Sequence, residues 1–443
     1  MKIIVVGAVA GGATSASQIR RMLTDAQINI YEKDRDMSFA NCGLPYYLGE
    51  VFTERERLLQ ATPDSFNDQK NITVKTKHEV TAVNPQRRTV TVYNHDSEES
   101  FEDNYDALIL SPGCRPISMA ATQGSSIVFP LRNLEDTDAI EQYIDSHHVQ
   151  KALIIGAGYI GLEMVENFKH RGLDVTLTSR SEHIMKAMDQ QFIPLLKNII
   201  VEQQVHLILG DELAQLNGNE VTFKSGHKES FDIIIEAIGI TPNTEFLTDS
   251  GIELNDRGYI KVNDYFETSI DGIYALGDAI ETFYRHTKDK TTVALAWGAH
   301  RAANLIAGNL SGDKQPFKGL LATNIVRFFD YTIASVGISE SALQSYDYEH
   351  INYQQKNHAN YLPDARVTSV SVYYRKDNRQ LLRACVFGQE GVDKRIDIIA
   401  TAMGLGATVD DFKDIEIAYA PPYSSPKDIV NMIGYRAHTD KRS

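Results

Sequence analysis

The sequence is poor in cysteine, with only three in 443 residues and no two of them close together. Such a set is too small and too scattered for the disulfide framework of a secreted scaffold. It also excludes a redox pair of neighbouring cysteines, so any redox work by Cys42 is done without a nearby protein thiol. Cys114 and Cys385 lie beside strand-like apolar runs and are expected to be buried and inert. A thiol kept available suits a reducing compartment, so we expect a cytoplasmic protein.

Long apolar runs are missing as well. No uninterrupted stretch approaches the roughly 18 to 20 residues that a helix needs to cross a bilayer, so we expect no transmembrane helix. The apolar run at the N-terminus is short, and its glycines fit a nucleotide-binding turn better than a signal peptide.

Basic residues are fewer than acidic ones. The sequence has 44 Lys and Arg but 59 Asp and Glu, which gives a formal net charge of -15. This balance disfavours nonspecific attraction to nucleic acid or to an anionic membrane, and neither is expected as a partner. An anionic ligand would have to be met by a local basic patch. No metal site is predicted.

The chain does contain a β-α-β pattern at its start. An apolar strand over 2–6 leads into a glycine-rich turn, a helical pattern reaches Met22, and a second strand over 28–31 ends at Glu32. Such a turn lets the backbone approach a pyrophosphate, and the carboxylate accepts hydrogen bonds from ribose hydroxyls. Val9 stands where this pattern usually has its middle glycine. The predicted dinucleotide contacts are Gly7, Ala8, Val9, Ala10, Gly11, Gly12, Glu32 and Lys33.

A second pattern of the same kind begins near residue 152. Its second strand, over 174–178, is followed by Ser179 and Arg180 instead of an acid. A carboxylate there would repel a 2'-phosphate, whereas a hydroxyl and a guanidinium can hold it, so we expect NADPH in preference to NADH. The alternative is that Arg180 is an ordinary solvated charge. The predicted contacts are Gly156, Gly158, Tyr159, Ile160, Gly161, Ser179 and Arg180.

Each fingerprint is later followed by a similar strand and turn, over 105–113 and over 231–239, so the chain looks internally duplicated. Gly239 closes the second of these turns and is a further predicted cofactor contact. Residues 268–278 read as another strand that closes on Gly277 and Asp278, whose polar atoms suit a second contact with a cofactor.

With these motifs the chain resembles the two-dinucleotide-binding flavoproteins of the pyridine nucleotide-disulfide reductase superfamily, over essentially its whole length. Gly277 and Asp278 match the flavin-binding signature of that family. The resemblance implies an α/β fold with two Rossmann-like dinucleotide-binding domains, the second inserted in the first, and a C-terminal α+β dimerisation domain. It implies FAD at the first fingerprint and NADPH at the second. The implied domains are 1–113 with 245–320 for FAD, 114–244 for NADPH and 321–443 for dimerisation.

Because Cys42 has no second cysteine near it, the chain resembles the single-cysteine branch of the superfamily. Four runs, over 7–14, 38–42, 358–361 and 418–424, are similar to those of its coenzyme A-disulfide reductases. The resemblance therefore implies reduction of coenzyme A disulfide to two coenzyme A thiols through a mixed disulfide with Cys42. Such an activity would maintain the intracellular thiol balance.

The resemblance also assigns roles residue by residue. Cys42 would be the catalytic thiol, and Tyr361 and Tyr419 would reach the active site from the other subunit of a homodimer, Tyr419 also contacting the cofactor. Tyr159 and Glu163 match the gate and the carboxamide contact of the nicotinamide pocket. The positions that match contacts of coenzyme A are Thr14, Gln18, Arg21, Ser38, Asn41, Lys70, His300 and Lys427.

Two local expectations come from the residues themselves. Asn41 can cap a helix that begins at Cys42, with Pro45 in its first turn, so that the helix dipole would favour the thiolate. On the first helix, Arg20 and Arg21 can both present guanidinium groups to an anionic substrate tail.

The last third of the chain has a different pattern. Strand-like runs over 324–329 and 367–374 suggest an antiparallel sheet, with helices over 393–403 and near Asp428. This part fits the dimerisation domain that the resemblance implies.

Three other functions stay open. An NADH oxidase or peroxidase would cycle Cys42 through a sulfenic acid, although Arg180 and the lack of a histidine between Gly7 and Arg21 weigh against it. Reduction of coenzyme A persulfide or polysulfide would use the same mixed-disulfide site. A flavoprotein whose redox state controls a partner protein would turn over every small disulfide slowly.

Overall fold

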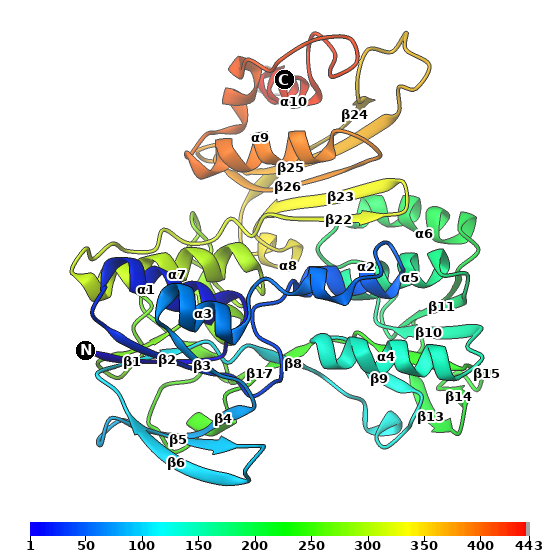
Figure 1. Cartoon of the computed structure of the whole chain (residues 1–443). Coiled ribbons are helices and arrows are strands. Elements are labelled where there is room, and N and C mark those ends of the chain that lie inside the picture. Colours follow the sequence, from blue (N-terminus) through cyan, green and yellow to red (C-terminus); the bar gives the residue numbers. More distant parts are fainter. Residues whose placement is uncertain (440–443) are drawn as a thin grey trace. The chain divides into compact units, whose positions relative to one another are not determined.

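The structure is a computed structural model, which describes residues 1–439 (Figure 1). The chain divides into two compact units. The first unit comprises Met1–Val149, Ile235–Phe283 and Asp289–Gly319. The second comprises Gln150–Ile234, Tyr284–Lys288 and the chain from Leu320 onward. The predicted boundaries of three domains are finer than this division and stay a prediction.

A parallel sheet forms the core of the first unit, in the order β19-β7-β1-β2-β3. Its central strand β1 is apolar and almost wholly buried, as expected for a strand covered on both faces. The helix α1 connects β1 to β2 and packs against α7, which confirms the predicted β-α-β unit. The bounds are β1 Lys2–Val6, α1 Ala10–Met22, β2 Gln27–Tyr31, β3 Thr73–Lys75, β7 Ala107–Leu110, β19 Ile273–Ala275 and α7 Ala296–Ser311.

Shorter elements surround this sheet. The hairpin strands β4, β5 and β6 form an antiparallel sheet, and β8 pairs with β17. The bounds are η1 Asn41–Gly43, α2 Leu44–Leu48, η2 Arg55–Leu58, α3 Pro63–Lys70, β4 His78–Asn84, β5 Thr89–Asn94, β6 Glu99–Asn104, β8 Cys114–Pro116, η3 Ala120–Thr122, β9 Val128–Pro130, α4 Leu134–Ser146, β17 Ile240–Pro242, η5 Glu245–Leu247, β18 Ile260–Lys261, η6 Gly277–Ala279, β20 Ile280–Phe283 and β21 Lys290–Thr291.

The second unit repeats the β-α-β arrangement, with β10, β11 and β12 parallel and α5 between the first two. This confirms the second predicted fingerprint unit. The bounds are β10 Lys151–Ile155, α5 Tyr159–His170, β11 Asp174–Ser179, η4 Gln190–Phe192, α6 Ile193–Glu202, β12 His206–Leu209, β13 Leu213–Asn217, β14 Glu220–Phe223 and β15 Lys228–Ser230, with β16 Ile233–Glu236 running across the division between the units.

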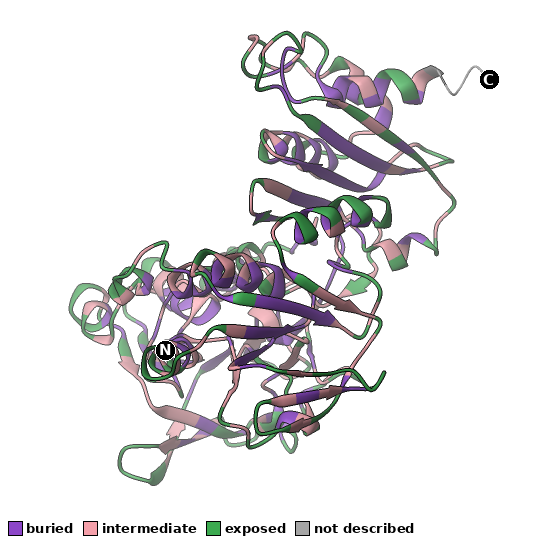
Figure 2. Ribbon diagram, turned by 90° about the vertical axis from the view of Figure 1, so that its right-hand side faces the viewer, coloured by how far each residue is buried: buried purple, intermediate pink, exposed green. Residues whose placement is uncertain are grey.

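The same unit contains the predicted antiparallel sheet, in the order β22-β23-β26-β25-β24. The helix α9 packs on β23 and β26, and α10 packs on β24 and η7. The strands β23, β25 and β26 appear mainly in purple in Figure 2, because their side chains form a buried apolar cluster with α9 and α10. The bounds are β22 Asn324–Phe328, β23 Tyr331–Gly337, α8 Glu340–Leu343, β24 Tyr348–Lys356, β25 Val367–Arg375, β26 Leu381–Gly388, α9 Val392–Gly404, η7 Val409–Asp414 and α10 Ile429–Thr439.

No helix within residues 1–439 is both long and apolar enough to span a membrane.

Candidate active site

The first glycine turn joins β1 to α1 and has no room for side chains at its ends. Gly7 has a φ of +91°, and a Cβ on it would lie 2.2 Å from the carbonyl oxygen of Ser111. A Cβ on Gly12 would lie 1.8 Å from the carbonyl oxygen of Gly7. Val9, in contrast, has a φ of -92°, so its position does not require glycine. The first turn of α1 has neither a side-chain cap nor an acidic residue, which leaves its amides available to an anion.

Glu32 lies at the end of β2 and is only 5% exposed. Its Oε2 accepts a hydrogen bond from the amide of Ala8 at 2.7 Å, and its Oε1 accepts one from the amide of Asp34 at 3.0 Å. Burial raises the pKa of Glu32 to about 7, against the two hydrogen bonds that lower it. A buried carboxylate with remaining lone pairs fits the ribose hydroxyls of a dinucleotide. Lys33, next to it, is exposed.

Asp278 follows Gly277 in η6, and burial raises its pKa. Its carboxylate pairs with the guanidinium of Arg132 at 3.2 Å, and its backbone carbonyl accepts a hydrogen bond from the thiol of Cys114 at 3.3 Å. Arg132 also donates from Nε to the carbonyl of Cys114 at 3.0 Å. Arg132 is not predictable from the sequence, because it belongs to no motif and lies 146 residues before Asp278.

Cys42 lies in the short turn η1 and is exposed, whereas the other two cysteines are buried, as expected. The predicted capping by Asn41 is wrong. The N-cap position is Ala40, without a side-chain hydrogen bond, and the amide Nδ2 of Asn41 donates instead to the carbonyl of Arg132 at 3.3 Å. The helix α2 starts only at Leu44 and has five residues, with Pro45 in its first turn. The thiolate therefore lacks the capped helix N-terminus that the sequence suggested.

The residues 38–42, called here the redox segment, are fixed through their backbone. The amide of Ser38 donates to the carbonyl of Ala8 at 2.8 Å, and the carbonyl of Ser38 accepts from the amide of Gln60 at 2.7 Å. The amide of Ala40 donates to the carbonyl of Leu58 at 2.9 Å. Ser38 has a φ of +45°, a conformation uncommon outside glycine that is often found at functional sites. The redox segment is thus tied directly to the first glycine turn.

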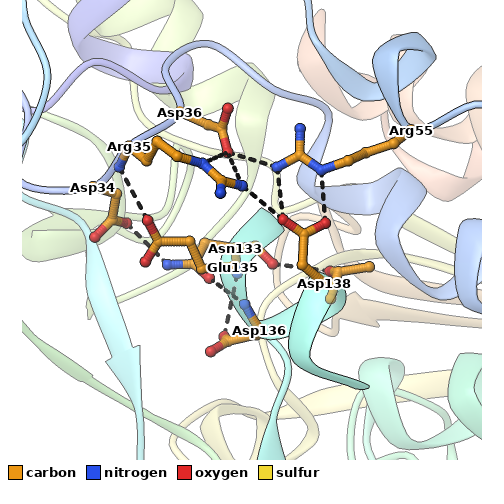
Figure 3. Close-up of polar contacts among 9 residues, drawn as sticks. Asp34, Arg35, Asp36, Arg55, Asn133, Glu135, Asp136 and Asp138 are labelled. Atoms are coloured by element: carbon orange, nitrogen blue, oxygen red, sulfur yellow. Dashed lines mark hydrogen bonds and ion pairs between the residues drawn. The ribbon is translucent and has the colours of Figure 1, made fainter. Parts of the chain in front are cut away.

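An ion-pair cluster holds the chain just before the redox segment (Figure 3). Arg55 donates to Asp138 from Nε at 2.6 Å and to Asp36 at 2.7 Å, and Arg35 pairs with Asp138 at 2.7 Å. Although burial raises the pKa of Asp138, hydrogen bonds from both guanidinium groups bring it below its usual range. Several charges that share partners hold a geometry better than an isolated surface pair. Since Asp138 belongs to α4, this cluster ties the redox segment to that helix.

Arg21 on α1 and Lys70 on α3 form a small basic patch. The Nζ of Lys70 donates to Ser17 at 3.0 Å, and burial together with the charge of Arg21 lowers the pKa of Lys70. Within residues 1–439 neither cation pairs with a carboxylate. Two neighbouring cations without a carboxylate partner favour an anionic ligand.

Arg20 does not belong to this patch, which corrects the sequence-based expectation. Its guanidinium donates to the backbone carbonyls of Lys70, Thr24 and Asn71 at 2.9, 2.5 and 2.7 Å. Arg20 thereby satisfies carbonyls at the end of α3 and in the turn after α1, and all three of its guanidinium nitrogens donate to the backbone.

Two of the predicted polar contacts come together where α1 and α7 pack. The hydroxyl of Thr14 and the Nδ1 of His300 are 2.8 Å apart, although they are 286 residues apart in the chain. Gln18 lies one helical turn after Thr14 on the same face of α1. The structure therefore groups Thr14 and Gln18, on the helix that also carries Arg21, with His300 on α7.

The second glycine turn has the same construction as the first. Gly156 has a φ of +111°, and a Cβ on Gly161 would lie 1.9 Å from the carbonyl oxygen of Gly156. A Cβ on Gly158 would meet no atom within 4 Å. Arg180 is exposed after β11, and the hydroxyl of Ser179 accepts a hydrogen bond from the amide of Ser181 at 3.2 Å.

Tyr159 begins α5, directly after this turn. Its hydroxyl donates to the side chain of Asn324, whose Nδ2 in turn donates to Ser335 at 2.9 Å. One turn later, burial raises the pKa of Glu163 to about 7. Asn324 carries no sequence signal of this contact, because only the fold brings it to Tyr159.

Tyr361 and Tyr419 are on loops of the second unit and are 69% and 49% exposed. Lys427 is also exposed, and its ammonium lies 5.1 Å from the ring centroid of Tyr435.

The predicted site residues are distributed over both units. Those in the first unit are Gly7, Ala8, Val9, Ala10, Gly11, Gly12, Thr14, Gln18, Arg21, Glu32, Lys33, Ser38, Asn41, Cys42, Lys70, Gly239, Gly277, Asp278 and His300. Those in the second are Gly156, Gly158, Tyr159, Ile160, Gly161, Glu163, Ser179, Arg180, Tyr361, Tyr419 and Lys427.

Comparison with protein families gives two matches that follow each other along the chain. Residues 1–303 match the pyridine nucleotide-disulphide oxidoreductases, and residues 323–428 match the dimerisation domain of the same proteins. The chain belongs to this family. It is therefore an oxidoreductase, and the match to the dimerisation domain indicates a homodimer.

Individual relatives agree with this membership. A coenzyme A disulfide reductase of Staphylococcus haemolyticus is 53% identical over 98% of this chain and 99% of its own length. The structure of reduced CoADR-RHD from Bacillus anthracis has a TM-score of 0.97 and 40% identity, covering 99% of this chain and 80% of that one. A NAD-dependent persulfide reductase from A. fulgidus has a TM-score of 0.95 and 30% identity, covering 100% and 84%.

Membership of the pyridine nucleotide-disulphide oxidoreductases implies FAD and a nicotinamide nucleotide as cofactors. The residues described above fit both groups. The turn at Gly7, the buried carboxylate of Glu32 and the half-buried carboxylate of Asp278 suit FAD, while the open space at Gly158 admits the pyrophosphate of the second nucleotide.

Proposed function

We propose that this oxidoreductase reduces coenzyme A disulfide to two coenzyme A thiols, with NADPH as the preferred reductant and Cys42 as the catalytic thiol. The support is threefold. The one exposed cysteine within residues 1–439 belongs to the redox segment, which is bonded to the first glycine turn. The basic patch offers charge to an anionic tail. A relative of 53% identity over nearly the full length is a coenzyme A disulfide reductase.

The chemistry needs only one protein thiol. The thiolate of Cys42 attacks one sulfur of coenzyme A disulfide, forming a mixed disulfide and releasing one coenzyme A thiolate, which takes up a proton. Two electrons then cleave the mixed disulfide, releasing the second coenzyme A and restoring the thiolate. When bound, FAD supplies the path for these electrons from NADPH.

The observation that carries the proposal is the patch of Arg21 and Lys70. Coenzyme A has several phosphate charges, and this chain has a net charge of -15, so the tail must be held by cations that no carboxylate neutralises. Thr14, Gln18 and His300 lie on the same helix pair and would supply hydrogen bonds to the polar parts of the tail.

Other predicted roles are part of the same proposal. Ser179 and Arg180 would hold the 2'-phosphate of NADPH. Tyr159 would gate the nicotinamide pocket, with Glu163 as the carboxamide contact. In the homodimer, Tyr361 and Tyr419 would reach the active site of the other subunit, where a phenol can protonate a departing thiolate. Lys427 would add a cation to the substrate site.

Reduction of coenzyme A persulfide is the second candidate. It is favoured by the likeness to a persulfide reductase at 30% identity, and it would use the same thiol and the same basic patch. Attack by Cys42 forms the same mixed disulfide from both substrates, and only the leaving group differs, which is coenzyme A thiolate from the disulfide and hydrosulfide from the persulfide.

The test is anaerobic oxidation of NADPH by the FAD-loaded protein with coenzyme A disulfide. We expect turnover that Cys42→Ser abolishes and that exceeds turnover with glutathione disulfide, peroxide or coenzyme A persulfide. Arg21→Ala with Lys70→Ala should raise the KM for coenzyme A disulfide at least tenfold. The control Arg87→Ala removes an exposed cation paired with Glu102 and should leave that KM unchanged. Oxygen- or peroxide-dependent oxidation of NADH without disulfide turnover would contradict the proposal.

A further inference from the structure

The two tyrosine-bearing loops of the second unit are attached to one buried arginine. Arg395 is on α9, its side chain is 2% exposed, and its Nη2 donates to the carbonyl of Asn357 at 2.6 Å and to the carboxylate of Asp428 at 2.8 Å. Asn357 precedes the loop that carries Tyr361, and Asp428 follows the loop that carries Tyr419. One guanidinium nitrogen therefore connects the bases of both loops.

The surroundings of Arg395 leave little freedom. Its Nη1 donates to the carbonyl of Gly391 at 3.0 Å, and a Cβ on Gly391, whose φ is +70°, would lie 2.1 Å from that nitrogen. The carboxylate of Asp428 is 1% exposed and also accepts hydrogen bonds from the hydroxyl of Ser424 at 2.7 Å and from the amide of Val430 at 3.1 Å. The pair is thus enclosed and oriented from several sides.

The two loops are also bonded to each other. The amide of Ala359 donates to the carbonyl of Pro421 at 3.1 Å. Close to this contact His358 is buried, and its Nε2 lies 3.2 Å from Asp364. The tips behave differently, because Tyr361 and Tyr419 are exposed and neither phenol has a hydrogen-bond partner among residues 1–439.

A buried ion pair is a poor means of raising stability. Removing two charges from water costs several kcal/mol per ion, and well-packed apolar residues often serve as well. What such a pair does provide is a fixed geometry, because breaking it leaves an uncompensated charge. Here the geometry that it fixes is that of the bases of the two loops that carry Tyr361 and Tyr419.

We propose that Arg395 is a positioning residue that, with Asp428, sets Tyr361 and Tyr419 as one rigid pair for the active site. This inference rests on the proposed function, in which both phenols act on coenzyme A disulfide. The pair acts through the loops and does not touch the substrate. Loosening it should slow the disulfide half-reaction and leave the reduction of the cofactor by NADPH unaffected.

The first experiment is hydrogen exchange on Arg395→Lys, which keeps the charge but cannot donate in two directions from a planar fork. We expect the amides of the segments 357–362 and 418–424 to exchange at least tenfold faster than in the parent protein. The matched control is Arg383→Lys, since Arg383 is equally buried in the same unit but pairs with Asp189. Arg383→Lys should leave the rate of amide hydrogen exchange in both segments unchanged.

The second experiment is a double-mutant cycle on the FAD-loaded homodimer with coenzyme A disulfide. Arg395→Lys should lower kcat at least tenfold and leave the rate of cofactor reduction by NADPH within twofold. In a protein that already carries Tyr361→Phe and Tyr419→Phe, the same change should lower kcat less than twofold, because the groups that it positions are gone. Ser424→Ala removes one hydrogen bond from Asp428 and should change hydrogen exchange and kcat in the same direction as Arg395→Lys, by a smaller factor. It replaces Arg395→Lys in both experiments if that variant does not fold.

The outcomes separate the two proposals. Parent protein that does not turn over coenzyme A disulfide overturns the proposed function. Unchanged exchange in Arg395→Lys and Ser424→Ala, or an equal loss of kcat with and without the two tyrosines, overturns the positioning role of Arg395.

Discussion

The carboxylate of Glu32 accepts a hydrogen bond from the backbone amide of Ala8 at 2.7 Å. This contact joins the end of β2 to the glycine turn after β1, so the two parts of the first fingerprint are connected before any nucleotide binds. The connection has an electrostatic cost, because the carboxylate is buried and its pKa is raised to about 7.

Stability of the FAD-stripped protein should therefore fall as pH rises through the raised pKa of Glu32. The folded-state pKa lies above the ordinary value of 4.5, so the contribution of Glu32 is fully present below about pH 4.5 and is lost by about pH 7. The difference corresponds to roughly 3 kcal/mol. Urea unfolding at pH 5 and pH 8 should show that the free energy of unfolding falls less between these two pH values in Glu32→Gln than in the parent protein. The exposed control Glu99→Gln should lose as much free energy of unfolding as the parent protein over this pH range. An equal loss in the parent, Glu32→Gln and Glu99→Gln would contradict the assignment to Glu32.

Only Cys42 should react with a thiol reagent in the native protein. Burial raises the pKa of both Cys114 and Cys385 to about 12, so neither forms the thiolate that reacts. After reduction with a small thiol and its removal, we expect one thiol per chain to titrate natively and three in denaturant. Cys42→Ser should then show none and two. Native labelling of Cys114 would show that the first unit opens around Asp278.

Sequence patterns predict the parts of this protein whose determinants are local. The strand, turn and helix of each fingerprint follow one another in the chain, and α1 ends at Met22, the residue that the pattern predicts. Side-chain partners at long range are a different matter. Asn41 was expected to cap a helix but bonds to the carbonyl of Arg132, 91 residues away. Arg20 was expected to face a ligand but bonds to the end of α3.

The same limit applies to residues that the sequence analysis did not name. Arg132, Asn324 and Arg395 acquire their roles only from the fold, and none lies in a motif. The cytoplasmic placement and the roles of Tyr361 and Tyr419 rest on composition and on resemblance, and they stay predictions.

Changing Gly158 or Gly161 to alanine should have different effects on stability and on nucleotide binding. A Cβ on Gly161 would lie 1.9 Å from the carbonyl of Gly156, so the turn must shift and both stability and nucleotide binding should suffer. A Cβ on Gly158 meets no protein atom within 4 Å, so Gly158→Ala should keep the parent melting temperature while the KM for NADPH rises at least tenfold. Calorimetry gives the melting temperature of each variant, and steady-state kinetics give its KM for NADPH. Parent kinetics in Gly158→Ala would mean that the nucleotide does not approach this glycine.

Arg180→Ala should reduce the preference for NADPH. A charge-assisted hydrogen bond is worth about 1.5 to 3 kcal/mol, which is roughly a 10- to 150-fold loss in kcat/KM for NADPH. NADH has no 2'-phosphate, so its kcat/KM should change less than threefold. Steady-state kinetics with both nucleotides give the comparison. A loss of the same size with both would make Arg180 a general contact of the nucleotide and not the source of specificity.

Asp189→Asn should destabilise the protein far more than the loss of an exposed ion pair. Asp189 accepts a hydrogen bond from Nε of Arg383 at 2.8 Å, with both side chains almost wholly buried. Removing one partner leaves a buried charge uncompensated, which costs about 3 to 5 kcal/mol. The control Asp347→Asn breaks an exposed pair with Lys376 and should leave the free energy of unfolding nearly unchanged.

The consequence of Asp189→Asn should also reach the nucleotide. Asp189 belongs to the chain segment that follows Ser179 and Arg180 after β11, and Arg383 on β26 holds that segment through the carbonyl of Ala187 as well, at 2.5 Å. Freed from this anchor, the segment should bind NADPH more weakly, with a KM raised severalfold at a temperature where the variant is still folded. Denaturant unfolding and NADPH kinetics on the same preparation test both effects. A variant as stable as Asp347→Asn would show that Arg383 finds another partner when its carboxylate is removed.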